Sequence, residues 1–88
     1  MNRILLVDDS RSILEFFRSL ILGLEDCEPV LFSRPLEALE WCRNEVPDLA
    51  IVDYMMPCMD GLQFIDSFRA IHDRDEIPLI MVTSNIDK

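Results

Sequence analysis

Basic residues are scarce in this chain. Eight Lys and Arg side chains stand against 17 Asp and Glu side chains, which gives a formal net charge of −9 at pH 7. A surface of this sign repels nucleic acid and anionic lipid, because binding to either depends on clustered cationic side chains. The composition therefore argues against direct contact with nucleic acid or with a membrane surface.

Long apolar runs are also missing near the start of the chain. The first run, residues 4–7, meets acidic residues after four positions. A transmembrane helix needs about 20 apolar residues, and the core of a signal peptide about 7 or more. We therefore expect no targeting segment, no membrane span and a cytoplasmic location.

Cysteine is sparse and its spacing is uninformative. Cys27, Cys42 and Cys58 form neither an even-numbered disulfide framework nor a C-x-x-C metal or redox motif. Reduced thiols fit the cytoplasm. Cys58 shares a loop with Met55 and Met56, but thioethers without a companion His or Cys cluster pack more often than they bind a soft metal.

Apolar runs alternate with segments of helical periodicity. Residues 4–7, 30–32, 49–52 and 79–82 predict strands, with 30–32 at an edge, and the segments between them predict three helices. The apolar residues predicted to face inward are Ile13, Phe16, Phe17, Leu20 and Ile21 in the first helix, Leu36, Leu39 and Cys42 in the second, and Leu62, Ile65, Phe68 and Ile71 in the third. This alternation indicates a single α/β domain with a parallel sheet and helices on both faces.

Polar side chains close three of the predicted strands. Asp8 and Asp9 follow residues 4–7, Asp53 follows residues 49–52, and Thr83 follows residues 79–82. The carboxyl ends of parallel strands share one edge, where open α/β sheets bind ligands. Two carboxylates about 5 Å apart repel by roughly 3 kcal/mol at an effective dielectric of about 20. We therefore expect a divalent cation among these three acidic residues.

The ligand chemistry favours magnesium and phosphoryl transfer. Mg²⁺ prefers hard oxygen ligands and keeps several waters, and it neutralises the charge on a transferring phosphoryl group. Asp53 is then placed as a nucleophile, because carboxylates accept phosphoryl groups as aspartyl phosphates. The hydroxyl of Thr83 can donate a hydrogen bond to a phosphate oxygen. The residues thus predict Mg²⁺-dependent phosphorylation of Asp53.

Four segments also carry a family resemblance. They are ILLVDDS at residues 4–10, LAIVDYMMP at 49–57, DG at 60–61 and PLIMVTS at 78–84. In order and spacing they resemble the receiver domain of bacterial two-component response regulators. The resemblance implies a flavodoxin-like parallel sheet, with strand order 2-1-3-4 over the strands that this chain contains.

The resemblance also implies a role for each site residue. Asp53 would be the phosphoacceptor, Asp9 a direct Mg²⁺ ligand, Asp8 a ligand largely through water, and Met55 a ligand through its backbone carbonyl. The hydroxyl of Thr83 would move onto the phosphorylated aspartate. The partner would be a sensor histidine kinase or a phosphotransfer protein. The domain itself would not be an enzyme beyond self-phosphorylation and autodephosphorylation.

The chain departs from the family pattern at its C-terminal end. The family has five strands and five helices, and residues 1–88 supply four strands and three helices, so we expect the N-terminal part of a receiver domain. The family's lysine after the fifth strand has no counterpart, since Lys88 lies too close to Thr83. A non-phosphorylatable fragment that acts as an interaction module, and dimerises through the exposed edge of residues 79–82, stays open as an alternative.

Two other functions, phosphatase and flavodoxin, fit the residues less well. An aspartate-nucleophile phosphatase would carry a D-x-D motif, whereas Asp8 and Asp9 are adjacent. A flavodoxin would carry a Ser/Thr/Gly-rich phosphate loop after the first strand. His72, at the end of the third predicted helix, is expected to be an exposed surface residue.

Overall fold

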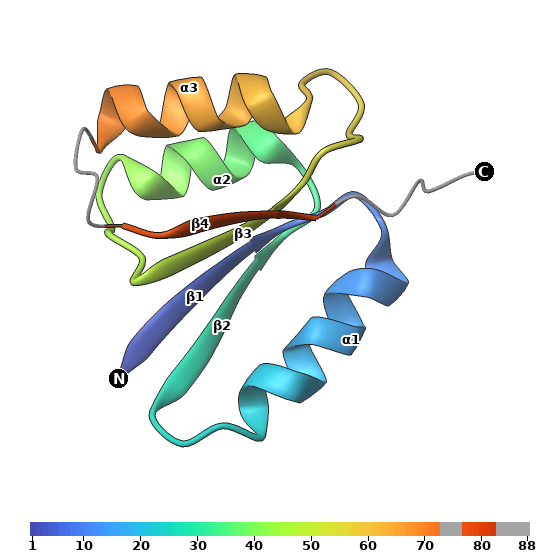
Figure 1. Ribbon diagram of the computed structural model, residues 1–88, viewed down its shortest axis with the longest axis vertical. Coiled ribbons are helices and arrows are strands. Elements are labelled where there is room, and N and C mark those ends of the chain that lie inside the picture. Colours follow the sequence, from blue (N-terminus) through green and yellow to red (C-terminus); the bar gives the residue numbers. More distant parts are fainter. Residues whose placement is uncertain (73–76, 83–88) are drawn as a thin grey trace.

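Strands and helices alternate along the chain in the computed structural model, which describes residues 1–72 and 77–82 (Figure 1). The elements are β1 (Asn2–Val7), α1 (Arg11–Leu22), β2 (Cys27–Phe32), α2 (Pro35–Cys42), β3 (Leu49–Asp53), α3 (Gly61–Ile71) and β4 (Leu79–Val82). All seven elements were predicted. The first two strands start earlier than expected, because an apolar run marks only the buried part of a strand.

The four strands form one parallel sheet in the order β2-β1-β3-β4. β1 is paired on both sides, and β2 lies at an edge, as predicted. Val7 of β1 is the register partner of Val52 in β3, and Asp53 is the partner of Val82 in β4. The carboxyl ends of β1 and β3 are therefore level with each other.

The sheet is covered by two helices on one face and one on the other. α2 and α3 lie together on one face, and α1 lies on the opposite face (Figure 1). Successive residues of β1 alternate between the two cores, so that Leu5 and Val7 pack under α2 and α3 while Ile4 and Leu6 pack under α1. This explains why the strand reads as a continuous apolar run.

The buried stripes of the helices differ from the predicted ones. Four residues predicted to face inward are exposed: Phe16, Leu20, Leu36 and Leu62. Leu14 in α1 and Ala38 in α2, which were not assigned to the inward faces, are buried. Apolar residues cover more of each helix than the sheet can bury, so periodicity alone selected the wrong edge of the stripe.

The expectation of an exposed His72 was also wrong. Its side chain is half-buried at the end of α3, and Nε2 lies 3.1 Å from the carbonyl oxygen of Glu45. The ring also packs against Phe68 with an edge-on geometry. His72 thus joins α3 to the segment before β3.

Over residues 1–72 and 77–82, we find no helix with the length and apolar character that crossing a bilayer requires.

Candidate functional site

Three carboxylates converge at the carboxyl edge of the sheet. Asp8 and Asp9 follow β1, and Asp53 is the last residue of β3. Because Val7 pairs with Val52, the next residues, Asp8 and Asp53, come side by side. One oxygen from each of the three carboxylates lies within 4.8 Å of the others. The structure thus brings together the three acidic residues that the sequence singled out.

Two of these carboxylates are buried. Asp8 and Asp53 expose 4% and 2% of their surface, whereas Asp9 is exposed. Asp8 Oδ1 accepts a hydrogen bond of 2.8 Å from the backbone N–H of Ser10, which is also the N-cap residue of α1. Asp53 Oδ1 is buried, and the part of the chain that the structure describes offers it no hydrogen-bond partner. A buried carboxylate oxygen without a hydrogen-bond donor indicates a site that binds a ligand.

The environment disfavours ionisation of both buried acids. Burial raises the pKa of Asp8, and the charge of Asp9 raises it further, against the lowering effect of the Ser10 N–H. Burial also raises the pKa of Asp53, as do the charges of Asp8 and Asp9, while the N–H groups of Met55 and Tyr54 lower it. A cation bound among the three carboxylates would reverse this balance.

The donor set suits a hard divalent cation. Oxygens bound to the same Mg²⁺ at about 2.1 Å lie at most about 4.2 Å apart. The 4.8 Å bound on the carboxylate oxygens therefore fits direct ligation after a small side-chain adjustment, or ligation of one carboxylate through water. The residues present fit Mg²⁺ by both ligand type and spacing.

The loop after β3 is held close to the site. Gly61 N donates a 2.9 Å hydrogen bond to the carbonyl oxygen of Tyr54. A Cβ on Gly61 would lie only 3.0 Å from the carbonyl oxygen of Asp53 and from Tyr54 Cα. Asp60 and Gln63 form a reciprocal capping box at the start of α3. The helix therefore begins in direct contact with the strand end that carries Asp53, a constraint that the sequence did not reveal.

Two predicted site residues need separate comment. The side chain of Met55 is exposed, and its predicted role as a ligand through the backbone carbonyl stays a prediction. Thr83 lies outside the described residues, so its role stays a prediction.

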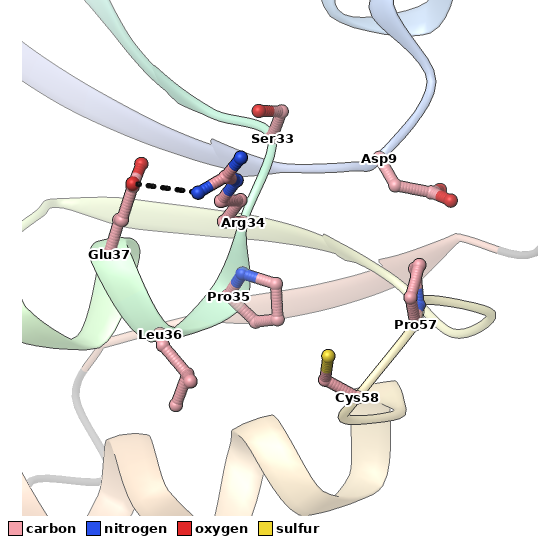
Figure 2. A pocket seen from close by; sticks show the side chains of 8 residues that line it. All are labelled: Asp9, Ser33, Arg34, Pro35, Leu36, Glu37, Pro57 and Cys58. Carbon is pink, nitrogen blue, oxygen red and sulfur yellow. Dashed lines mark ion pairs between the residues drawn. The ribbon is translucent and has the colours of Figure 1, made fainter.

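A cavity of about 520 Å³ has Asp9 of the carboxylate cluster in its lining (Figure 2). The rest of the lining comes from the segment between β2 and α2, the start of α2 and the loop between β3 and α3, and consists of Ser33, Arg34, Pro35, Leu36, Glu37, Pro57 and Cys58. Cys58 adopts a left-handed backbone conformation, with φ 74°. Sequence reasoning missed this cavity, because no single motif joins residues that come from separate segments of the chain.

Comparisons with known proteins identify relatives over almost the whole chain. The family model for the response regulator receiver domain matches residues 4–88. The cyclic di-GMP phosphodiesterase response regulator RpfG of Xanthomonas campestris is 40% identical over 84 residues, which cover 91% of this chain and 21% of that protein. The response regulator MprA of a Mycobacterium species is 34% identical over 82 residues, covering 93% of this chain and 34% of that protein. The chain therefore spans only about a fifth to a third of these relatives.

Solved structures agree with this relationship. Chemotaxis protein CheY4 of Vibrio cholerae superimposes with a TM-score of 0.84 at 30% identity, covering 99% of this chain and 72% of that one. A chain from the complex of histidine kinase ThkA with response regulator protein TrrA superimposes with a TM-score of 0.83 at 29% identity, covering 99% of this chain and 72% of that chain. With the strand order, the acidic cluster and the family match in agreement, this chain belongs to the response regulator receiver domain family of two-component signalling proteins.

Proposed function

We propose that this chain is a phosphoryl-accepting receiver in which Asp53 takes a phosphoryl group in a Mg²⁺-dependent reaction. The observation that carries the proposal is the convergence of Asp8, Asp9 and Asp53, with the buried Oδ1 of Asp53 lacking a hydrogen-bond donor within the described residues. Such an oxygen is available to a metal ion or to phosphorus.

Each residue has a distinct part in the proposed reaction. Asp8, Asp9, Asp53 and the Met55 carbonyl would hold Mg²⁺, which offsets negative charge on the phosphoryl group when it is bound. A carboxylate oxygen of Asp53 forms a bond to phosphorus as the bond between phosphorus and the donor breaks, which leaves an aspartyl phosphate. Thr83 would donate a hydrogen bond to that phosphoryl group. Hydrolysis of the acyl phosphate restores the carboxylate.

The proposed partner is a sensor histidine kinase or a phosphotransfer protein. Support comes from the likeness to a chain of the complex between histidine kinase ThkA and response regulator TrrA. The proposal places the reaction in the cytoplasm and gives the domain no enzymatic activity beyond its own phosphorylation and dephosphorylation. The activities named for longer relatives, such as cyclic di-GMP hydrolysis, are not assigned to this chain.

Mass spectrometry tests the proposal directly. The chain is incubated with Mg²⁺ and a small phosphodonor, and the intact mass and the modified residue are determined. We expect one added phosphoryl group on Asp53, lost in Asp53→Asn and lost when Mg²⁺ is chelated. Asp66→Asn is the matched control, because Asp66 is an exposed aspartate on α3. Unchanged phosphorylation of Asp53→Asn would refute the assignment of the phosphoacceptor.

A second candidate function is self-association through β4. Within the described residues β4 pairs on one side only, with β3, and it exposes 50% of Ile80 and 37% of Met81. An unpaired strand edge with exposed apolar side chains favours pairing with another copy. Sedimentation at rising concentration would show a dimer that Ile80→Lys weakens and that Leu22→Lys, at an exposed position on α1, leaves intact. A monomer at every concentration would exclude this function.

A further inference from the structure

One acidic side chain in the lining of the cavity has no counter-charge within the described residues. Arg34 and Glu37 lie together on one side and pair with each other, with Nη1 and Oε2 3.8 Å apart (Figure 2). Asp9 lies on the other side (Figure 2). In the part of the chain that the structure describes, no hydrogen bond or ion pair reaches the carboxylate of Asp9. The lining therefore carries a net negative charge, which is located at Asp9.

The surroundings of Asp9 reinforce this negative charge. An oxygen of its carboxylate lies within 4.8 Å of oxygens of Asp8 and Asp53, and the whole chain carries a formal net charge of −9. A concave site lined by charge of one sign concentrates ions of the opposite sign. The cavity therefore favours a cation over an anion, because the guanidinium of Arg34 is already offset by Glu37.

The walls of the cavity are mainly apolar. Pro35, Leu36 and Pro57 form them, with the sulfur of Cys58 between them (Figure 2). Cavities of about 300–1,000 Å³ with apolar walls and a few polar groups are typical of small-molecule sites. An inorganic cation would leave these walls exposed to water, and a neutral apolar molecule would leave Asp9 without a counter-charge. A protonated amine on a short apolar body satisfies both parts of the lining.

We propose that this cavity binds small primary amines, with the ammonium group at Asp9 and the apolar body against Leu36 and Pro57. An ammonium group has three N–H donors and no acceptor, so it pairs with a carboxylate and not with a guanidinium. Asp9 is also one of the three carboxylates that would hold Mg²⁺, so the amine and the ion should compete. Amine binding does not depend on phosphorylation of Asp53, and only the competition rests on the function proposed above.

NMR titration of the metal-free chain tests the ligand class. Three compounds share one phenyl ring and differ in charge: 2-phenylethylammonium, 2-phenylethanol and 3-phenylpropanoate. We expect the cation to bind at one site, the alcohol to bind about fivefold more weakly, which is the size of an exposed charge pair, and the anion to bind more weakly still. Equal affinity for all three compounds would overturn the inference, as would no binding of the cation at about 10 mM.

Two substitutions test where the ligand lies. Asp9→Asn should weaken binding of the cation about fivefold and leave the alcohol within about twofold. Leu36→Gln should weaken both compounds about threefold, the effect of losing roughly 30 Å² of apolar contact. Asp66→Asn and Leu62→Gln are the matched controls, because both side chains are exposed on α3 and lie outside the cavity lining. Undiminished binding of the cation to Asp9→Asn would overturn the inference.

Alkylation of Cys58 gives an independent measure of location. The Cys58 side chain is exposed and lines the cavity. The bound cation should therefore slow alkylation of its thiol in proportion to the fraction of the chain that is occupied. Cys27 is the control, because it lies at the other end of β2, and its alkylation rate should not change. An unchanged rate at Cys58 with the cation bound would place the ligand elsewhere and overturn the inference.

Magnesium separates failure of this inference from failure of the proposed function. Where Mg²⁺ binds, as its own effect on Tm shows, it should raise the apparent dissociation constant of the cation. An unchanged constant would then overturn the shared use of Asp9. Where Mg²⁺ does not bind, the proposed function fails, and the dependence of amine affinity on ligand charge and on Asp9 still decides this inference.

Discussion

Asp8 and Asp53 occupy equivalent positions at the ends of two neighbouring parallel strands, and both carboxylates are buried there. Their oxygens lie within 4.8 Å, where two unit charges repel by roughly 3 kcal/mol at an effective dielectric of about 20. The fold thus holds like charges together at a position fixed by strand register. Removing one charge, protonating it or neutralising it with a cation should each stabilise the domain.

Substitution of the phosphoacceptor should therefore make the metal-free protein more stable. We expect Asp53→Asn to raise the free energy of unfolding by about 1–3 kcal/mol in the presence of a chelator, since the amide keeps the shape and removes the repulsion. For a domain of this size each kcal/mol raises Tm by about 4–8 °C. Denaturant unfolding measures the difference.

Magnesium supplies the control for that measurement. Added Mg²⁺ should raise the Tm of the unmodified chain and have a much smaller effect on Asp53→Asn, because binding to the folded state stabilises it only where the ligands are complete. Asp66→Asn, at an exposed position on α3, should respond to Mg²⁺ like the unmodified chain. A stability loss in Asp53→Asn would contradict the repulsion argument.

The raised pKa values of Asp8 and Asp53 predict a definite pH dependence. A carboxyl whose pKa is higher in the folded than in the unfolded state binds its proton more tightly when folded. Its contribution to stability is fully present below the unfolded-state pKa and is lost as pH rises through the folded-state pKa. Without Mg²⁺, the stability advantage of Asp53→Asn over the unmodified chain should therefore shrink as pH falls from 7 into the acidic range. Unfolding curves at several pH values would measure this change. A stability difference between Asp53→Asn and the unmodified chain that stays constant with pH would contradict the raised pKa of Asp53.

The gathering of the three acidic residues at one edge of the sheet could be predicted from the sequence, because alternating strands and helices allow few arrangements of a sheet. Short strands linked by helices must run parallel, and parallel strands must end at one edge. The residues after each apolar run therefore lie there, which brings Asp8, Asp9 and Asp53 together. The strand order itself came from the family resemblance, since periodicity carries no information on which strands are neighbours.

The helix faces and the cavity could not be predicted in the same way. α1 carries apolar residues around much of its circumference, and only contact with the sheet decides that Leu14 is buried and Phe16 exposed. The position of Arg34 relative to Pro57 depends on the paths of two loops, which no local pattern specifies. Such features arise from packing between distant segments.

At Gly61 even one added methyl group should destabilise the domain. An added Cβ would lie 3.0 Å from backbone atoms of Asp53 and Tyr54, which cannot move aside as a flexible side chain can. We expect Gly61→Ala to cost about 1–3 kcal/mol of stability and to slow phosphorylation of Asp53 by shifting the end of β3. Gly23→Ala is the control, because a Cβ there meets ordinary contacts of 3.4 Å or more. Equal tolerance at both positions would show that α3 does not constrain the site.

Cys42 and Cys58 should differ sharply in the reactivity of their thiols. Burial raises the pKa of Cys42 to about 11, so that only about one molecule in a thousand carries the reactive thiolate at pH 8. Cys58 is exposed at the rim of the cavity. Brief alkylation followed by peptide mapping should label Cys58 and spare Cys42 until the protein unfolds. Early labelling of Cys42 would indicate that the core under α2 opens readily.

The position of β3 between β1 and β4 has a consequence for motion at the acidic edge. β1 and β3 are each paired on both sides, but β2, the outer neighbour of β1, pairs over six register positions, whereas β4, the outer neighbour of β3, pairs over four within the described residues. Local opening of the sheet should therefore begin at β4 and reach β3 first. Asp53 lies on the strand beside that shorter pairing and Asp8 on the strand beside the longer one, so these fluctuations should change the distance between the two carboxylates mainly by moving Asp53.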